Sequence, residues 1–215
     1  MRILPAMPVP ADAPPPRSLA IGCAVTPSAR RLGPALITLG ERWPGIAVGI
    51  CELPRNALFA GVRSGELALA ITPEASSPEL ETTVLWRDLP LISVAATHPL
   101  ATLRLPSAVD LAGLLRLMPR EPGAADIQRF LGATYLPTQS GPIRLVEGND
   151  RALARALRDS DAYILDSVET RRRPTPGVTR RLLRGAEPFA VSAHWRAPLS
   201  APAADLIALL SRPRP

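Results

Sequence analysis

Lysine is absent from this 215-residue chain, so all 25 basic residues are arginines, set against 19 acidic residues for a formal charge of +6. The absence excludes a phosphate-loop lysine, a Schiff-base lysine and a serine–lysine nucleophile pair. A positive charge of this size is also found in nucleic-acid-binding proteins, but no compact basic helix accompanies it here. We therefore interpret the arginines as a solvated surface.

Histidine and cysteine are also scarce, with two residues of each. His98 and His194 have no carboxylate at a metal-ligand spacing, which argues against a metal site and against acid–base catalysis. Cys23 and Cys51 lack C-x-x-C spacing, so we expect two buried thiols on neighbouring strands, with a disulfide or a metal pair as the alternative. Because G-x-S-x-G, H-E-x-x-H and G-x-G-x-x-G motifs are missing too, we expect no cofactor, no metal and no enzymatic activity.

Long hydrophobic runs are missing as well. No apolar stretch approaches the roughly 18 residues of a membrane helix. Prolines interrupt residues 1–17, where a secretory signal needs a continuous apolar segment. We therefore expect a cytoplasmic protein without a membrane partner. The six prolines of residues 1–17 predict a disordered tail.

Residues 18–53 predict a strand, a crossover helix and a second, parallel strand. The apolar runs at 19–25 and 46–51 are short enough for buried strands. Between them, apolar side chains recur along one face of a helix, at Leu32, Leu36, Leu39 and Trp43.

Strand and helix patterns continue to alternate along the rest of the chain, which is typical of the α/β class. Further strands are expected at 66–71, 83–86, 89–95, 115–118, 143–147, 162–165, 178–183 and 189–195. Helices are expected at 58–64, 107–114, 127–131, 150–157 and 202–210. Pro54, Arg55 and Asn56 predict a turn, and residues 171–174 predict a basic loop.

Candidate ligand-binding residues follow the ends of these strands. In open α/β sheets, ligands bind beyond the carboxyl ends of strands, where helix N-termini direct free N–H groups at anions. Thr26 and Ser28 follow the first strand and offer hydroxyls to an anion, or act only as helix caps. Arg55 follows the second strand and can pair with a carboxylate, or is a solvated turn residue. The other candidates, each of which also fits a rim, turn or cap, are Thr72, Arg120, Glu121, Gly123 and Asn149.

Five short motifs, in this order, resemble the effector-binding domain of LysR-type transcriptional regulators. They are LAIG at 19–22, RWPG at 42–45, RSGELALAI at 63–71, PLISV at 90–94 with HPL at 98–100, and AHWR at 193–196. The resemblance extends over residues 18–212. Two positions depart from the family pattern. Arg55 stands near a usual serine or threonine, and residues 159–164 replace a Gly-x-Gly-Ile stretch.

The resemblance implies two Rossmann-like α/β subdomains of the periplasmic-binding-protein type II kind, joined by two crossover strands. Subdomain I would hold residues 18–89 and 189–215, and subdomain II residues 90–188. It also implies a small-molecule effector between the subdomains, and a homodimer or a pairing with a full-length LysR-type regulator. Because the family's winged helix-turn-helix is not recognisable in this sequence, we expect no specific DNA binding by this chain alone.

These observations together predict a small organic acid as the effector. Its acid group would sit at Thr26 and Ser28 with Arg55 nearby, and its apolar part would face Glu121 and Gly123. The alternatives are the solute-binding protein of a transporter, an enzyme on a related fold, and a truncated or degenerate regulator without a ligand.

Overall fold

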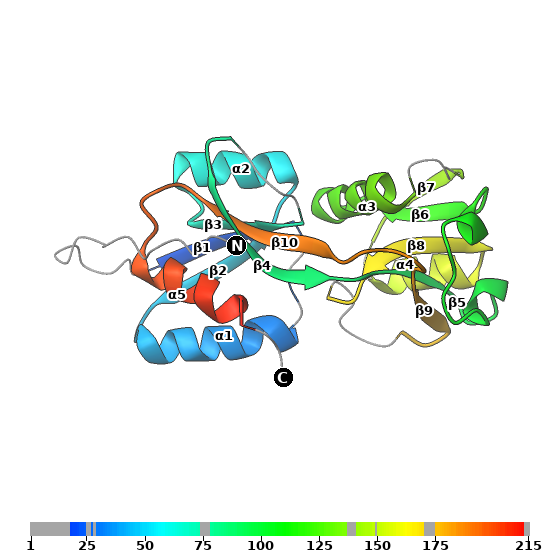
Figure 1. Ribbon diagram of the computed structural model, residues 1–215, viewed down its shortest axis with the longest axis horizontal. Helices are drawn as coiled ribbons and strands as arrows, with labels where there is room; N and C mark the ends of the chain where they lie inside the picture. Colours follow the sequence, from blue (N-terminus) through cyan, green and yellow to red (C-terminus); the bar gives the residue numbers. More distant parts are fainter. Residues whose placement is uncertain are drawn as a thin grey trace.

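The computed structural model describes residues 18–24, 27, 29–73, 78–136, 141–148, 150–169 and 175–212. These residues form two lobes, each built around a five-stranded mixed sheet with helices packed against it (Figure 1). The expected disordered tail at 1–17 and the expected basic loop at 171–174 lie outside the described residues. None of the described helices is long and apolar enough to cross a membrane.

The sheet of lobe I has the strand order β2-β1-β3-β10-β4. Its strands are β1 (Ser18–Cys23), β2 (Ala47–Glu52), β3 (Leu69–Thr72), β4 (Glu81–Asp88) and β10 (Phe189–Trp195). The lobe's helices are α1 (Ala29–Arg42), α2 (Arg55–Ser64) and α5 (Ala201–Leu210). Figure 1 shows α1 and α5 on one side of the sheet and α2 on the other. The two faces of this sheet carry separate hydrophobic clusters. Ile21 of β1 packs in one cluster with Leu39 of α1, and Leu58 of α2 belongs to the other.

The predicted strand–helix–strand unit is confirmed. β1 and β2 run parallel with Ser18 opposite Ala47 and Cys23 opposite Glu52. Cys23 is buried as expected, but Cys51 is exposed, and neither forms a disulfide. Cys51 lies opposite Gly22, so its side chain and that of Cys23 point to opposite faces of the sheet. The alternating pleat therefore keeps the two thiols apart.

The sheet of lobe II has the strand order β7-β6-β8-β5-β9. Its strands are β5 (Pro90–Ala95), β6 (Leu115–Pro119), β7 (Ile143–Val146), β8 (Ala162–Ser167) and β9 (Val178–Leu182). Two α-helices, α3 (Pro122–Tyr135) and α4 (Asp150–Arg158), and two single 3₁₀ turns, Pro99–Ala101 and Val109–Leu111, complete the lobe. Leu165 of β8 shares a cluster with Leu131 of α3, and Ile164 shares another with Leu157 of α4. The two helices therefore cover opposite faces of the sheet.

Two of the sequence-based expectations are wrong in detail. The helix expected at 107–114 is only the 3₁₀ turn Val109–Leu111, because the chain leaves helical geometry at Ala112 and Gly113 has a φ of 72°. Arg55 does not lie in a turn but begins α2, directly after the extended Pro54.

The lobes are joined where β4 runs into β5 and where the chain returns from β9 into β10. β4 and β10 pair antiparallel from Phe189 opposite Asp88 to Trp195 opposite Glu81. They run side by side toward lobe II (Figure 1). From this topology we propose residues 18–89 with 189–215, and residues 90–188, as the two subdomains.

Candidate functional site

A small cavity lies between the lobes, beside the crossover at the end of β4. Its volume of about 30 Å³ holds roughly one or two water molecules. Both lobes contribute to its wall, which consists of Pro27, Ile71, Thr72, Pro73, Trp86, Asp88, Ile127, Ser167, Glu169, Phe189 and Val191. The wall is mostly apolar, and its polar residues are Thr72, Asp88, Ser167 and Glu169.

Two of the sequence-based candidates are related to this cavity. Thr72, the last residue of β3, lines it and is only 3% exposed. Pro27 also lines it and stands between Thr26 and Ser28 in the chain. Thr26 and Ser28 themselves, like Asn149, lie outside the described residues.

Arg55 lines a different hollow. It belongs to an open surface groove between α2 and α3, which has no lining residue in common with the cavity. Its backbone N–H donates to Asp126 Oδ2 at 2.8 Å, and its guanidinium lies 5.4 Å from the centroid of the Phe59 ring. The structure therefore does not bring Arg55 and Thr72 into one cavity.

The candidates around the start of α3 are placed by contacts between protein groups. Gly123 is buried, and a Cβ there would overlap the carbonyl oxygen of Ala24 and lie 3.1 Å from that of Leu53. The first turn of α3 thus abuts the carboxyl ends of β1 and β2 in lobe I. Arg120 forms a surface ion pair with Glu147 at 3.2 Å. Glu121 is exposed and makes no side-chain capping bond to α3.

Sequence reasoning missed an ion pair that connects the lobes at this cavity. Arg31, in the first turn of α1, approaches Glu169 Oε1, just beyond β8, at 3.3 Å. The two side chains are only 10% and 9% exposed. The Arg31 guanidinium also lies 4.3 Å from the centroid of the Trp86 ring and donates to the carbonyl of Leu210 at 3.3 Å. Because 138 residues separate Arg31 from Glu169, no local pattern could have indicated the pair.

Asp88 is the centre of the hydrogen-bond network at the crossover. Its Oδ2 accepts from Ser167 Oγ at 2.6 Å and from the backbone N–H of Glu169 at 3.3 Å, and its Oδ1 accepts from the N–H of Leu89 at 2.8 Å. Burial raises the pKa of the Asp88 carboxyl above its ordinary value of 3.8, and the nearby Glu169 charge acts in the same direction. The hydrogen bonds oppose that rise in pKa without cancelling it.

The raised pKa of Asp88 predicts a definite pH dependence of stability. Because the folded-state pKa exceeds the unfolded-state value, Asp88 favours folding below the unfolded pKa, and this contribution is lost as pH rises through the folded pKa. We therefore expect the difference in unfolding free energy between wild type and Asp88→Asn to shift in favour of wild type as pH falls from about 7 to about 4. Urea unfolding followed by circular dichroism measures this difference.

Asp110→Asn is the matched control for this measurement. Hydrogen bonds from Ser107 lower the pKa of the exposed Asp110 carboxyl, so the difference between wild type and Asp110→Asn should stay nearly flat down to about pH 4 and shift against wild type below it. A difference for Asp88→Asn that stays flat, or that follows the Asp110→Asn difference, would contradict this assignment.

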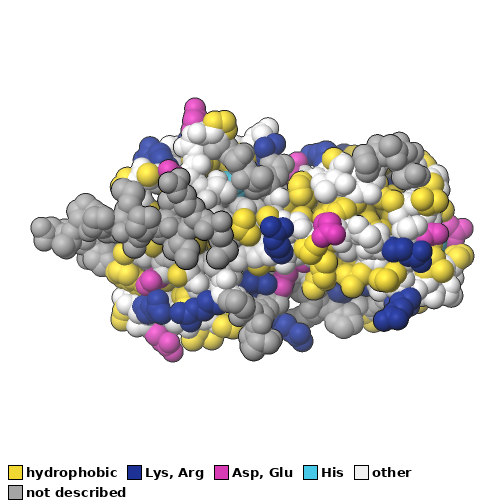
Figure 2. All heavy atoms as spheres, in the orientation of Figure 1, with side chains coloured by type: hydrophobic (Ala, Val, Ile, Leu, Met, Phe, Trp, Pro, Cys, Tyr) yellow, Lys and Arg dark blue, Asp and Glu magenta, His cyan; other side chains and the backbone are white. Residues whose placement is uncertain are grey.

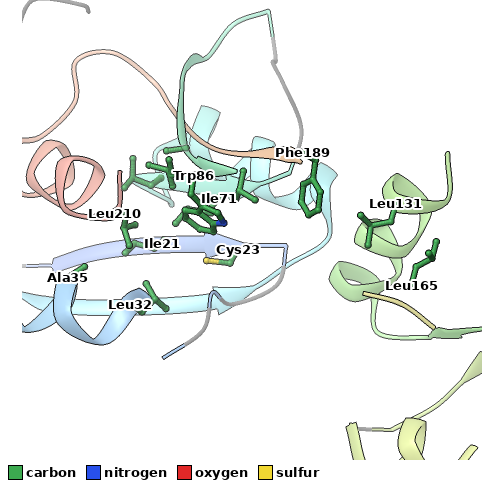
Figure 3. Packing of buried hydrophobic residues seen from close by; sticks show 14 of the residues in the cluster. Ile21, Cys23, Leu32, Ala35, Ile71, Trp86, Leu131, Leu165, Phe189 and Leu210 are labelled. Carbon is green, nitrogen blue, oxygen red and sulfur yellow. The ribbon is translucent and has the colours of Figure 1, made fainter. Parts of the chain in front are cut away.

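The indole N–H of Trp86 is a buried donor that needs an acceptor. Trp86 lines the cavity, is 9% exposed, and its Nε1 has no hydrogen-bond partner among the described residues. Figure 3 shows its nitrogen on the side of the ring nearer Cys23. An unsatisfied buried donor costs about 1–3 kcal/mol, so a water or ligand oxygen at this atom would be stabilising.

The described residues contain no group of three His, Cys, Asp or Glu side chains that could hold a metal ion. His98 accepts from the backbone N–H of Leu100 and so caps a 3₁₀ turn. His194 bonds to Thr82 Oγ1 through Nδ1 at 3.0 Å. On the face shown in Figure 2, arginines are dispersed among apolar and acidic side chains of the described surface.

Two mixed α/β sheets joined by crossover strands, with a cavity between them, define the type II periplasmic-binding-like class of fold. The model of the LysR substrate binding domain matches residues 12–211, and the chain belongs to that family. This match confirms the resemblance carried by the five motifs between residues 19 and 196. A comparison with curated proteins finds no match.

Solved structures of the same fold come from this family. Full-length BenM superposes with a TM-score of 0.74 at 16% identity, over 90% of this chain and 66% of BenM. The BenM effector binding domain with its effector benzoate gives a TM-score of 0.69 at 14% identity, over 92% of this chain and 96% of that domain. The C-terminal domain of a probable LysR family regulator from Rhodococcus sp. RHA1 gives 0.68 at 22% identity, over 91% and 98%.

Proposed function

We propose that this chain senses a small organic acid, as the effector-binding module of a LysR-type transcriptional regulator. The cavity between the lobes carries the proposal, since residues of both lobes line it. At about 30 Å³ it is smaller than an organic acid, so binding requires the lobes to part. The benzoate named as the effector of BenM is itself a small organic acid, which favours the same class here. A cytoplasmic location and the absence of specific DNA binding by this chain alone stay predictions from the sequence.

The proposed pose follows the chemistry of the wall. The acid group binds at Thr26 and Ser28, as expected from the sequence, and at Thr72, which lines the cavity. The apolar part contacts Ile71, Phe189 and Val191, which are apolar residues of the cavity wall. Asp88 is already engaged by Ser167 and by backbone N–H groups, and Glu169 by Arg31. Arg55, in the outer groove, attracts the acid at the entrance between the lobes.

A thermal-shift screen of organic acids tests this function. We expect at least one acid to stabilise the wild type, while its amide analogue does not. Thr26→Val and Thr72→Val each remove a hydroxyl, so each should weaken binding. Arg55→Ala removes a positive charge from the outer groove, so it should weaken binding less and mainly slow association. Arg144→Ala, on the exposed strand β7, is the control and should leave binding unchanged. Stabilisation by neutral or cationic compounds only, or no response to any acid, would contradict the proposal.

We further propose that the chain dimerises through α1 and β2 against lobe II of a second chain, or pairs in this way with a full-length regulator. Ile37 of α1 is 67% exposed, and β2 is an edge strand of its sheet. On lobe II, the edge strand β7 exposes Ile143 and Leu145, at 50% and 46%. These exposed apolar surfaces on the two lobes suit an isologous dimer. In it, α1 and β2 of each chain would pack against β7 of the other chain.

Ile37→Asp tests this surface. A charge in an apolar interface should convert the dimer to a monomer at tens of micromolar protein, a rough working range for such interfaces. Val109→Asp is the control, because Val109 is 72% exposed on lobe II away from β7 and should leave the dimer intact. Sedimentation velocity gives the mass of each variant. A monomeric wild type, or a dimer unaffected by Ile37→Asp, would count against the interface.

A further inference from the structure

We propose that Glu169 occupies the anion position beside Arg31 that the acid group of the effector takes, so that an acid binds by displacing Glu169 from Arg31. This inference rests on the proposed function and adds to it the cationic partner of the effector and a built-in competitor. Arg31 and Glu169 were not among the residues expected from the sequence to bind a ligand.

Arg31 is held as a fixed anion-binding group. Its side chain is only 10% exposed, and two elements of lobe I, β4 and α5, contact its guanidinium. The Trp86 ring lies beneath it at 4.3 Å, and the Leu210 carbonyl accepts one N–H group at 3.3 Å. Both contacts belong to lobe I, so they remain when lobe II moves. A guanidinium with its plane fixed in this way loses little further freedom when it binds an anion.

The contact with Glu169 is the one that a ligand can replace. In this ion pair, Arg31 Nη2 lies 3.3 Å from Glu169 Oε1. Charge-assisted N–H···O bonds are usually about 2.7–2.9 Å long, and carboxylates often bind arginine through two parallel bonds. A free carboxylate can adopt that better geometry, whereas the backbone of Glu169 is held by its N–H bond to Asp88, at the end of β4. Glu169 also lines the cavity, so displacement of its carboxylate frees space there for the ligand.

The Trp86 indole N–H is independent support for an acceptor ligand at this place. Its Nε1 is buried without a hydrogen-bond partner among the described residues, and the ring that carries it lies under Arg31 and lines the cavity. A ligand with two acceptor oxygens, such as a carboxylate, can engage the guanidinium and the indole N–H together. Glu169 uses its carboxylate on Arg31, and Nε1 stays unsatisfied. A small acid therefore satisfies a donor that the internal carboxylate leaves unpaired.

The test compares benzoate and its neutral analogue benzamide on the full-length chain, by isothermal titration calorimetry. Glu169→Gln keeps the shape of the side chain and removes its charge, so benzoate should bind about tenfold or more tightly than to wild type. Benzamide should show no such gain. In the Glu169→Gln background, Trp86→Phe should weaken benzoate binding several-fold. Glu169→Ala, which also frees space, should tighten benzoate binding if Glu169→Gln folds poorly.

Glu147→Gln is the matched control. Glu147 is a lobe II glutamate in a surface ion pair with Arg120, with 76% of its side chain exposed. It should not change benzoate binding. Unchanged or weaker benzoate binding in both Glu169 variants, no benzoate binding to either of them, or an equal gain for benzamide would overturn the proposal. If acids stabilise the wild type but neither Glu169 variant tightens binding, the inference fails while the proposed function stands. If benzoate binds the Glu169 variants while no acid affects the wild type, Glu169 blocks the site as inferred, but the proposed function as an acid sensor fails.

Discussion

Arg31→Met is expected to lower the free energy of unfolding by about 3–5 kcal/mol, the usual effect of removing one partner of a buried ion pair. The Glu169 side chain, only 9% exposed, would lose the guanidinium that now faces it. The substitution would also remove the cation that lies over the ring of Trp86. Urea unfolding at neutral pH measures the loss, and the double variant Arg31→Met/Glu169→Gln should recover most of it.

Arg120→Met is the matched comparison for Arg31→Met. The ion pair of Arg120 with Glu147 joins side chains that are 60% and 76% exposed, so the loss should stay below about 1 kcal/mol. Equal losses for Arg31→Met and Arg120→Met would mean that the ion pair between the lobes is no stronger than a surface contact.

Gly123→Val is expected to cost about 2–3 kcal/mol of unfolding free energy, within the range for overpacking a close contact. A side chain at this position meets backbone atoms, the carbonyl oxygens of Ala24 and Leu53, which cannot turn aside as a side chain can. The N-terminus of α3 would have to withdraw from the ends of β1 and β2. The variant should therefore also widen the gap between the lobes, which small-angle scattering detects as a larger radius of gyration.

Gly40→Val is the control for this glycine. Gly40 lies in α1, and a Cβ there meets nothing within 4 Å, so the change should stay within about 0.5 kcal/mol of wild type. If Gly123→Val matches Gly40→Val in both stability and radius of gyration, the close approach between α3 and lobe I does not exist in solution.

The sequence was sufficient for most of the fold because the relevant signals are local. The apolar run at 189–195 coincides with β10, and the helical spacing of Leu32 to Trp43 lies on α1 and the turn after it. The strand–helix–strand opening follows from such periodicity together with the handedness of crossovers. The acidic first turn predicted a longer helix than the 3₁₀ turn at Val109–Leu111. The signal that shortens it is Gly113, whose positive φ follows shortly after the turn.

The candidate site was harder to predict because it is made of contacts distant in sequence. Thr72 was expected at the rim from its place at a strand end, and it lines the cavity. Arg55 also follows a strand, but as the first residue of α2 it lines the outer groove and lies over Phe59. Arg31 is one arginine among several on its helix, and only the folded chain places it against Glu169 and Trp86.

The most direct test of the account is the movement of the Trp86 indole signal in a ¹H–¹⁵N correlation spectrum. The chain has three tryptophans, and the indole N–H of Trp43 is already bonded to Asp205 at 2.9 Å. On titration with the acid that stabilises the protein most, we expect the Trp86 indole peak to shift in proportion to occupancy, while the peaks of Trp43 and Trp195 stay in place. A Trp86 peak that stays fixed while the acid saturates the protein would contradict a binding site in the cavity between the lobes.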